Sequence, residues 1–351
     1  MEAAWTDEST VAPADFRTYP RLRFMGSKHR LLPWLESVLS ELPFESAVDA
    51  FSGSGCVSYL LKTMGKRVHS NDFLAFARDL SLATVVNSTE TLDEDDVGSL
   101  VEKTGGHDTF IERTFRGIFF TDEENRFLDR VCGRLDTLSD EKAALARAAL
   151  YRSCLKRQPR GVFTVAGERY DDGRRDLRLT LPEHFLESVT IFNELVFDNG
   201  HSHRATCRDV FELGRTSTEL AYLDPPYVPR ADDNCYIKRY HFLEGLATYW
   251  QGAEFHPTSK VRKLRKRHTP FSYRRAAEGA FDRLFAAFAD RIVVLSYSSN
   301  GYPDIDRIVE LMEQYKSNVV VHERTHRYHF GTHRRVAAER ALVTEYLVVG
   351  T

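Results

Sequence analysis

The sequence predicts an α/β fold: a mostly parallel sheet flanked by helices, with an antiparallel edge strand. Three observations support this prediction. Short apolar runs recur along the chain, segments with a helical period lie between them, and a glycine-rich turn joins an early run to the helix after it. The chain has 351 residues, which is enough for one large domain and a smaller one.

The N-terminal part begins with a tail and a helix. Residues 1–18 show little periodicity and are expected to form a flexible tail, whereas residues 28–40 predict the opening helix, with Pro33 in its first turn. Residues 46–61 then predict a strand, a glycine-rich turn and a second helix. Glycines in that turn let the backbone approach a ligand closely, and the helix start offers free N–H groups.

The spacing of the glycines limits the ligand. A dinucleotide site has a third glycine three positions after the second, but Ser58 stands three positions after Gly55. A smaller ligand, such as the carboxylate and amine of S-adenosylmethionine, therefore matches better than a pyrophosphate. A second predicted strand, residues 66–72, ends at Asp72, where such folds place a carboxylate that binds ribose hydroxyls. The alternative for Asp72 is a cap of the helix that follows.

The middle of the chain predicts a helical insert. Between residues 91 and 195 the apolar pattern is helical, and within it residues 161–164 and 178–181 predict a short hairpin. The insert separates residues 19–90 from residues 196–351, which together are expected to form one catalytic domain. Its position and basic loops favour target recognition, and a plain helical embellishment of that domain is the alternative.

Four later apolar runs complete the predicted sheet. Residues 220–223 and 291–297 predict two buried strands, and residues 318–321 and 341–349 predict the final pair. The first of these strands leads directly into the tetrapeptide Asp224-Pro225-Pro226-Tyr227, which is the most informative feature of the chain.

The tetrapeptide predicts a rigid polar loop. Its prolines donate no backbone N–H, and Pro225 forces Asp224 into extended geometry. The Asp224 carboxylate and the neighbouring carbonyls are thus fixed hydrogen-bond acceptors, with the Tyr227 ring beside them as a flat stacking surface. This combination suits a planar ring that bears an exocyclic amine, such as adenine or cytosine. A plain strand-end turn is the alternative.

Together these segments resemble the Dam-type, or class alpha, site-specific DNA adenine-N6 methyltransferases. Four matches carry the resemblance: the N-terminal cofactor motif, the glycine-rich loop, the ribose-binding acid and the catalytic tetrapeptide. In this chain they are Arg23-Phe24-Met25-Gly26-Ser27-Lys28, residues 48–55, Asp72 and residues 224–227. Residues 207–211 and 240–246 resemble the segment that contacts the cofactor's adenine and a later helix start.

The resemblance implies a Rossmann-like fold that binds S-adenosylmethionine. It covers about residues 20–90 and 196–350 and departs from the best-known members after Tyr227, where DNA contacts are expected. Lys28 would bind the cofactor's carboxylate and Phe24 would pack on its adenine; a helix-start cation and a core residue are the alternatives. The implied cofactor-binding residues are Phe24, Gly26, Lys28, Asp49, Phe51, Gly53, Gly55, Asp72 and Asp209.

The resemblance also implies the reaction, which is transfer of a methyl group to N6 of an adenine flipped out of double-stranded DNA. Asp224 and the Pro225 carbonyl would accept the two N6 hydrogens, Pro226 would stiffen the loop, and Tyr227 would stack on the base. The protein would serve in a restriction-modification system or as a solitary methylase. An RNA or cytosine-N4 methyltransferase and a catalytically inert DNA-binding relative are the alternatives.

Charge is segregated along the chain. The formal net charge is only −3, yet residues 260–275 hold eight Lys or Arg and no acid. Such a segment can bind phosphates even in a near-neutral protein, and a solvated surface is the alternative. The predicted DNA contacts are Arg157, Arg160, Lys260, Arg262, Lys263, Arg265, Lys266 and Arg267.

Other patterns argue against several classes of protein. The five cysteines are odd in number and include no CxxC pair, which argues against a disulfide scaffold and a metal site built from cysteines. No apolar run approaches the roughly 18 residues that span a bilayer, which argues against a membrane-spanning protein. The N-terminus is acidic and unlike a signal peptide. His322, His326, His329 and His333 lie among arginines, which repel a metal ion, so no metal site is predicted. We expect a cytoplasmic monomer that acts on DNA, with a cognate restriction endonuclease as a candidate partner.

Overall fold

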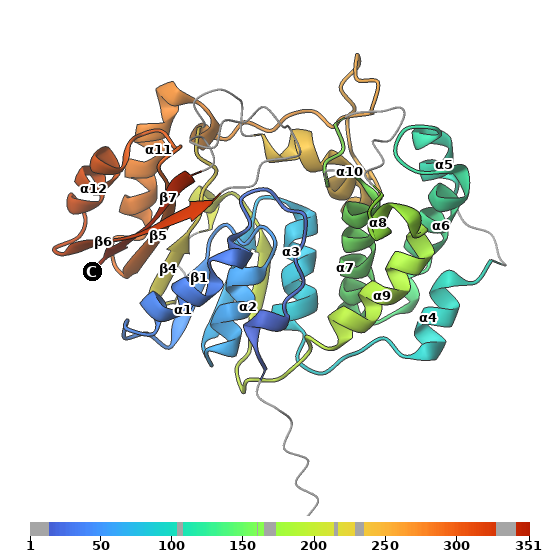
Figure 1. The fold of residues 1–351 in the computed structure, drawn as a ribbon, viewed down its shortest axis with the longest axis horizontal. Helices are drawn as coiled ribbons and strands as arrows, with labels where there is room; N and C mark the ends of the chain where they lie inside the picture. The colour runs from blue at the N-terminus through green and yellow to red at the C-terminus, as the bar shows by residue number, and fades with distance from the viewer. Residues whose placement is uncertain are drawn as a thin grey trace, which may run out of the picture.

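The computed structural model shows a central sheet with helices on both faces (Figure 1). It describes residues 14–103, 108–159, 161–164, 173–213, 217–228, 235–327 and 342–351. The strand order is β3-β2-β1-β4-β5-β7-β6. The strands are β1 (Ser46–Asp49), β2 (Arg67–Asp72), β3 (Arg204–Cys207), β4 (Leu220–Leu223), β5 (Ile292–Ser298), β6 (Val319–Arg327) and β7 (Leu342–Gly350).

Most of the sheet is parallel. β1 pairs with β2 and β4, β2 with β3, and β4 with β5, all in parallel, whereas β7 is antiparallel to both β5 and β6. The prediction of a mostly parallel sheet with an antiparallel edge is therefore confirmed. β1 and β4 are buried along their whole length, because helices on both faces require apolar side chains on each.

The two faces of the sheet pack against different helices. Successive side chains point to opposite faces, so Ala47 and Tyr222 join one hydrophobic cluster, whereas Val48 and Ala221 join another. The helices of the first cluster include α1 (Leu32–Leu39), α2 (Cys56–Thr63) and α3 (Ala75–Ser81), the last continued by a π-helical turn over Leu82–Val86. Those of the second are α11 (Arg274–Ala287) and α12 (Ile305–Glu313).

Residues 91–195 are largely helical in the described ranges, as predicted. The helices are α4 (Glu94–Val101), α5 (Phe110–Phe115), α6 (Asp122–Cys132), α7 (Asp140–Arg157), α8 (Arg175–Arg178) and α9 (Leu181–Asn193), with a 3-10 turn at Leu135–Thr137. The long helix α7 lies between α3 and α9 (Figure 1), and Tyr151 donates a 2.6 Å hydrogen bond to Asp79 on α3. One continuous core thus joins the insert to the sheet.

The hairpin expected at residues 161–164 and 178–181 is wrong. Residues 161–164 form no strand, and residues 175–178 form the short helix α8. Thr180 begins a helix instead, because its side chain accepts a hydrogen bond from the Glu183 backbone N–H while the Glu183 carboxylate accepts one from the Thr180 N–H. This capping box starts α9.

The N-terminal boundary also differs from the expectation. Phe16, which was assigned to the tail, is buried, and Phe16–Thr18 forms a 3-10 helix. The packed chain therefore begins before residue 19, and residues 1–13 of the expected tail lie outside the described residues. The opening helix is split into the 3-10 turn Lys28–Arg30 and α1, with proline in the first turn of α1 as predicted.

The strand register brings four acids to one edge of the sheet. Asp49 and Asp72 end β1 and β2, and Asp224 and Asp209 follow closely after β4 and β3. These are the carboxyl ends of neighbouring parallel strands. The strand order reverses direction between β1 and β4, and open α/β sheets bind ligands in the crevice at such a point.

Candidate active site

A pocket opens at this edge of the sheet. Segments far apart in the sequence line it: the N-terminal motif, the glycine-rich turn, the ends of β2 and β3, the tetrapeptide, the start of α10 (Tyr236–Thr248), and the chain before α11. The lining includes most of the predicted site residues, namely Phe24, Gly26, Lys28, Asp49, Phe51, Gly53, Asp72, Asp209, Asp224 and Pro226. Gly55 stands at the N-cap of α2 beside the pocket, and Pro225 and Tyr227 belong to the same loop as Asp224.

The glycine-rich turn has the backbone that the sequence predicts. Gly53 and Gly55 both have positive φ, at 50° and 79°, a region that glycine adopts without steric cost. A Cβ on Gly53 would lie 3.0 Å from the Phe24 ring, and one on Gly55 would lie 2.8 Å from the Tyr19 hydroxyl. The close contact between this turn and the N-terminal motif therefore requires glycine.

Asp72 connects β2 to the glycine-rich turn. Its carboxylate accepts hydrogen bonds from the backbone N–H of Gly53, at 2.7 Å, and of Leu74, at 2.9 Å. Burial raises the pKa of Asp72 to about 6, although these N–H groups lower it in part. Asp72 thus binds the backbone on both sides of the pocket edge and lines the pocket, but it is not the cap of α3, whose N-cap is Leu74.

Asp49 has one satisfied and one unsatisfied oxygen. Ser58, which occupies the position of the missing third glycine, donates a 2.7 Å hydrogen bond to Asp49 Oδ2. The buried Oδ1 has no hydrogen-bond partner among the described residues. Burial raises the pKa of Asp49 to about 7. A buried acceptor that lines a pocket without a partner marks a place where a ligand can donate a hydrogen bond.

Lys28 and Asp224 form a buried ion pair. The Lys28 Nζ lies 2.8 Å from Asp224 Oδ1, and the lysine is only 6% exposed. Burial lowers the pKa of Lys28, but Asp224 and the buried Glu345 on β7 raise it well above its usual value. Burial raises the pKa of Asp224, and Lys28 offsets part of that rise. From the sequence, Lys28 was predicted to bind the cofactor's carboxylate. In the structure, its ammonium group pairs with Asp224.

Two tyrosines to which the sequence analysis gave no role in the site hold the N-terminal motif in place. Phe24 stacks on Tyr240, with ring centroids 4.9 Å apart, and on Tyr236 at 5.5 Å. The Met25 N–H donates to the Tyr240 hydroxyl at 2.7 Å, and the Tyr236 hydroxyl donates to the Met25 carbonyl at 3.2 Å. Their four-residue spacing on a helix was the available signal, because it puts both rings on one face of α10.

The basic segment forms a loop beside the pocket. A bridge between Phe255 and Leu264 ties the loop, and Phe255 packs against Phe115 of the insert. Lys260, Arg262, Arg265 and Lys266 are exposed, Lys263 is half-buried, and Arg265 pairs with Glu254 at 3.0 Å. Arg267 differs from these residues because it lines the pocket and lies over the Phe73 ring, 5.2 Å from its centroid.

The other predicted DNA contacts have a different setting. Arg157 forms a mostly buried ion pair with Glu124 at 2.6 Å and donates to the Leu177 carbonyl at 2.8 Å. Its charge is therefore neutralised inside the insert, and we do not retain it as a DNA contact. Arg160 lies outside the described residues.

The described ranges contain no group of three His, Cys, Asp or Glu side chains placed to hold a metal ion. His322 and His326 lie on β6, and His329 and His333 fall outside these ranges. No helix among the described residues has both the length and the apolar character that crossing a bilayer requires.

The sheet order, the pocket at its switch point and the acidic proline loop define a Rossmann-like methyltransferase. The family model of the D12 class N6 adenine-specific DNA methyltransferases matches residues 24–293. The chain belongs to this family, so it is an enzyme that methylates adenine in DNA with a methyl donor.

Curated relatives agree with the family. The chain is 28% identical over 331 residues to the type II methyltransferase M2.HphI of Haemophilus parahaemolyticus. The matched residues cover 88% of this chain and 92% of the relative. It is 24% identical over 337 residues, or 88% of its length, to the modification methylase LlaI of Lactococcus lactis subsp. lactis, and spans 51% of that protein. It is 22% identical over 306 residues to the type II methyltransferase M.NlaIII of Neisseria lactamica, covering 84% and 88% of the two chains.

Proposed function

We propose that this enzyme transfers a methyl group from S-adenosylmethionine to N6 of an adenine that has been flipped out of double-stranded DNA. The observation that carries the proposal is the Lys28–Asp224 ion pair, which fixes a carboxylate in the same pocket as the glycine-rich turn. The names of the type II relatives further support a role as the modification enzyme of a restriction-modification system, with a cognate endonuclease as partner.

The pocket residues fit S-adenosylmethionine. The Asp49 Oδ1, which has no partner among the described residues, can accept a hydrogen bond from the cofactor's ammonium group. Asp72, which lines the same pocket, would bind the ribose hydroxyls. Phe24 and Phe51 supply apolar walls. Asp209, which follows β3 and lines the pocket, would contact the adenine of the cofactor. The glycines keep the turn free of Cβ atoms that would crowd Phe24 and Tyr19. When bound, the cofactor supplies an activated methyl group.

Asp224 positions the adenine amine. The N6 lone pair is delocalised into the ring, so N6 is a poor nucleophile until its hydrogens are held by acceptors. Asp224 and the Pro225 carbonyl accept those hydrogens, and the prolines keep both acceptors in fixed positions. Lys28 favours the ionised form of Asp224, in which neither oxygen carries a proton and both are strong hydrogen-bond acceptors. Tyr227, whose ring packs edge-on against Tyr297 at 5.4 Å, presents a base-stacking surface.

The basic loop supplies phosphate contacts for the DNA. Its exposed residues Lys260, Arg262 and Lys266 can neutralise backbone phosphates, and Arg267 extends from this loop to the cofactor pocket. The aromatic contact between Phe255 and Phe115 fixes the loop to the helical insert. We therefore propose that the insert and this loop together bind the target DNA, and that Arg267 belongs to the cofactor-binding residues.

The test is Asp224→Asn, which keeps the shape of the side chain and removes its charge. With labelled S-adenosylmethionine and DNA, we expect the rate of N6-methyladenine formation to fall by about 100-fold or more, because a preorganised charged acceptor is lost. Cofactor affinity should change by less than about threefold, since Asp224 is not assigned to the cofactor. Asp136→Asn, an exposed acid of the insert, is the control and should keep full activity.

Product analysis separates the alternatives. Digestion of methylated DNA and RNA to nucleosides should give N6-methyladenine from DNA alone. N4-methylcytosine, or label in RNA, would replace the proposed substrate with one of the alternatives. A variant with normal transfer would remove the role assigned to Asp224.

A further inference from the structure

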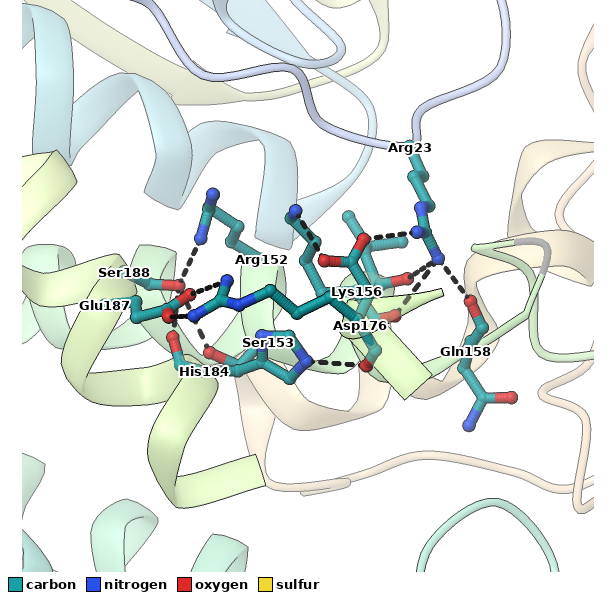
Figure 2. A network of polar contacts seen from close by, with 11 residues as sticks. Arg23, Arg152, Ser153, Lys156, Gln158, Asp176, His184, Glu187 and Ser188 are labelled. Carbon is teal, nitrogen blue, oxygen red and sulfur yellow. Dashed lines mark hydrogen bonds and ion pairs between the residues drawn. The ribbon is translucent and has the colours of Figure 1, made fainter. Parts of the chain in front are cut away.

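Arg23 lies between the cofactor pocket and the insert. It directly precedes Phe24 of the pocket lining, but its own side chain extends to the C-terminal end of α7 (Figure 2). There Arg23 Nη1 donates to the Gln158 carbonyl at 2.8 Å and the Lys156 carbonyl at 3.1 Å, with Leu155 O at 3.5 Å. These are carbonyls that the end of a helix leaves without an intrahelical partner. A cation at this position is also favoured by the helix dipole.

The same guanidinium also binds α8. Arg23 Nη2 lies 2.5 Å from Asp176 Oδ2, and Lys156 Nζ lies 3.0 Å from Asp176 Oδ1, so one carboxylate joins two cations (Figure 2). Burial would raise the pKa of Asp176, but Lys156 and Arg23 together lower it below its usual value. His184 on α9 contacts the Asp176 backbone carbonyl at 2.8 Å. Arg23 is thereby connected to three helices of the insert.

Backbone packing fixes the insert against Arg23. Gly161 has a φ of 66°, and a Cβ on it would lie 2.5 Å from the Arg23 Cβ and 2.9 Å from the Arg23 carbonyl oxygen. Two residues later, the Phe163 N–H donates to the Arg239 carbonyl at 2.9 Å. The chain after α7 therefore lies directly on the N-terminal motif and on α10.

The opposite side of this contact is the pocket wall. The Tyr240 hydroxyl lies 3.4 Å from the Arg23 carbonyl and 2.7 Å from the Met25 nitrogen, and its ring stacks on Phe24. Arg23 thus connects the end of α7 to the Phe24 ring that lines the pocket. The Arg23 side chain is only 22% exposed, so the surrounding protein holds it in this arrangement.

We propose that Arg23 is a positioning residue that couples the insert to the cofactor pocket. DNA bound to the insert and to the basic loop then stabilises the arrangement in which Phe24 lines the pocket, and the cofactor stabilises DNA binding to the same extent. This reciprocity is required of any equilibrium coupling between two sites. The inference rests on the proposed function, because it assigns the pocket to S-adenosylmethionine and the insert to DNA.

The test measures coupling by binding, without turnover. The dissociation constant of S-adenosylhomocysteine, the demethylated cofactor, is measured by calorimetry. It is measured with and without a DNA duplex that contains the sequence that the enzyme methylates. That site is first mapped by modified-base sequencing of DNA from cells that express the enzyme. In the wild type we expect the duplex to tighten cofactor binding by about fivefold or more.

Arg23→Lys is the main variant. It keeps the charge but loses the planar fork that contacts several carbonyls and Asp176 at once. In this variant we expect DNA to change the dissociation constant of S-adenosylhomocysteine by less than about twofold. The matched control is Arg126→Lys, because Arg126 pairs with Glu112 at 2.8 Å between α5 and α6, inside the insert and away from the pocket. The control should retain the wild-type effect.

The outcomes separate the two proposals. If wild-type protein does not bind S-adenosylhomocysteine, the proposed function fails and the coupling fails with it. If the wild type binds it but DNA has no effect, or if Arg23→Lys retains the full effect, only the coupling is overturned. Thermal unfolding checks each variant, and if Arg23→Lys does not fold, Asp176→Asn replaces it with the same expectation. A merely structural contact would lower the unfolding temperature and leave the DNA effect unchanged.

Discussion

Asp49 in the pocket is a carboxyl group whose burial makes its ionisation harder near neutral pH. Burial raises its pKa to about 7, with the Ser58 hydroxyl and the Phe51 backbone N–H lowering it only in part. The folded protein thus binds the carboxyl proton of Asp49 more tightly than the unfolded chain does. The contribution of Asp49 to the free energy of unfolding is present at acid pH and is lost as the pH rises through about 7. A ligand ammonium at Oδ1 would favour the ionised form and release the proton.

This reasoning predicts how cofactor affinity depends on pH. Between about pH 5.5 and 7.5, affinity for S-adenosylhomocysteine should rise about tenfold in the wild type, because the ammonium group binds ionised Asp49. In Asp49→Asn the affinity should be lower by about tenfold at neutral pH and lose this dependence. Calorimetry in buffers of different ionisation enthalpy should show proton release only with Asp49.

Asp72 provides the necessary comparison, since it faces the same pocket and its pKa is raised to about 6. In Asp72→Asn, cofactor affinity should still depend on pH near pH 7, because that part of the dependence belongs to Asp49. An Asp49→Asn variant with unchanged pH dependence would contradict the assignment.

At the level of single residues, the sequence identified most of the pocket but few of its contacts. Asp224 and Lys28 were both predicted, yet the bond between them joins residues 196 positions apart, and no local pattern indicates such a pair. Arg267 was assigned to DNA because a run of cations gives no indication of which exposed side chain lines the pocket. The tyrosines of α10 were given no role in the site because aromatic residues on a helix usually indicate a core.

The glycine-rich turn and the N-terminal motif act together as one element of the site. Gly53→Ala should lower cofactor affinity by about tenfold, because the new Cβ would press on Phe24 at 3.0 Å. Gly65→Ala is the matched control: its φ is also positive, at 77°, but no atom lies within 4 Å of its Cβ position.

Both substitutions should cost about 1 kcal/mol of stability, because alanine is disfavoured at positive φ. Only Gly53→Ala should affect cofactor binding, as calorimetry would show. Equal loss of affinity in both variants would mean that general destabilisation, and not the contact with Phe24, explains the effect.

Helices and strands were predicted well where the apolar residues repeat with a clear period. They were predicted poorly where side-chain hydrogen bonds determine the local structure. The apolar runs identified most strands of the sheet, including the antiparallel pair at the end of the chain, but not β3, whose residues Arg204–Cys207 form no apolar run. The hairpin in the insert failed because residues 178–181 alternate like a strand, while Thr180 and Glu183 form a capping box there. The loop over 249–267 has no regular period, so only the structure revealed the bridge between Phe255 and Leu264 and the position of Arg267 at the pocket.

The whole molecule separates its charge in space. Although the formal net charge is −3, the basic loop gathers exposed cations, and one of them, Arg267, lines the pocket. If Lys260 neutralises one DNA phosphate, Lys260→Gln should reduce the slope of log K against log salt concentration by about 0.9. Binding assays on one duplex at several salt concentrations would measure this slope.

Lys103→Gln is the control for this prediction. Lys103 is an exposed cation of the insert, 4.0 Å from Glu123 and outside the basic loop. It should leave the slope unchanged. A slope that is the same in Lys260→Gln and in the wild type would remove Lys260 from the DNA-binding surface.

The core shared by α3 and α7 has a consequence for building chimaeric enzymes. An exchange of residues 91–195 for the insert of another methyltransferase would strip α3 of its partner and leave Asp79 without the Tyr151 hydroxyl. A graft intended to alter sequence specificity should therefore retain α7 as part of the recipient and replace only the helices outside it. Crossover points chosen by domain boundaries alone would yield unstable hybrids.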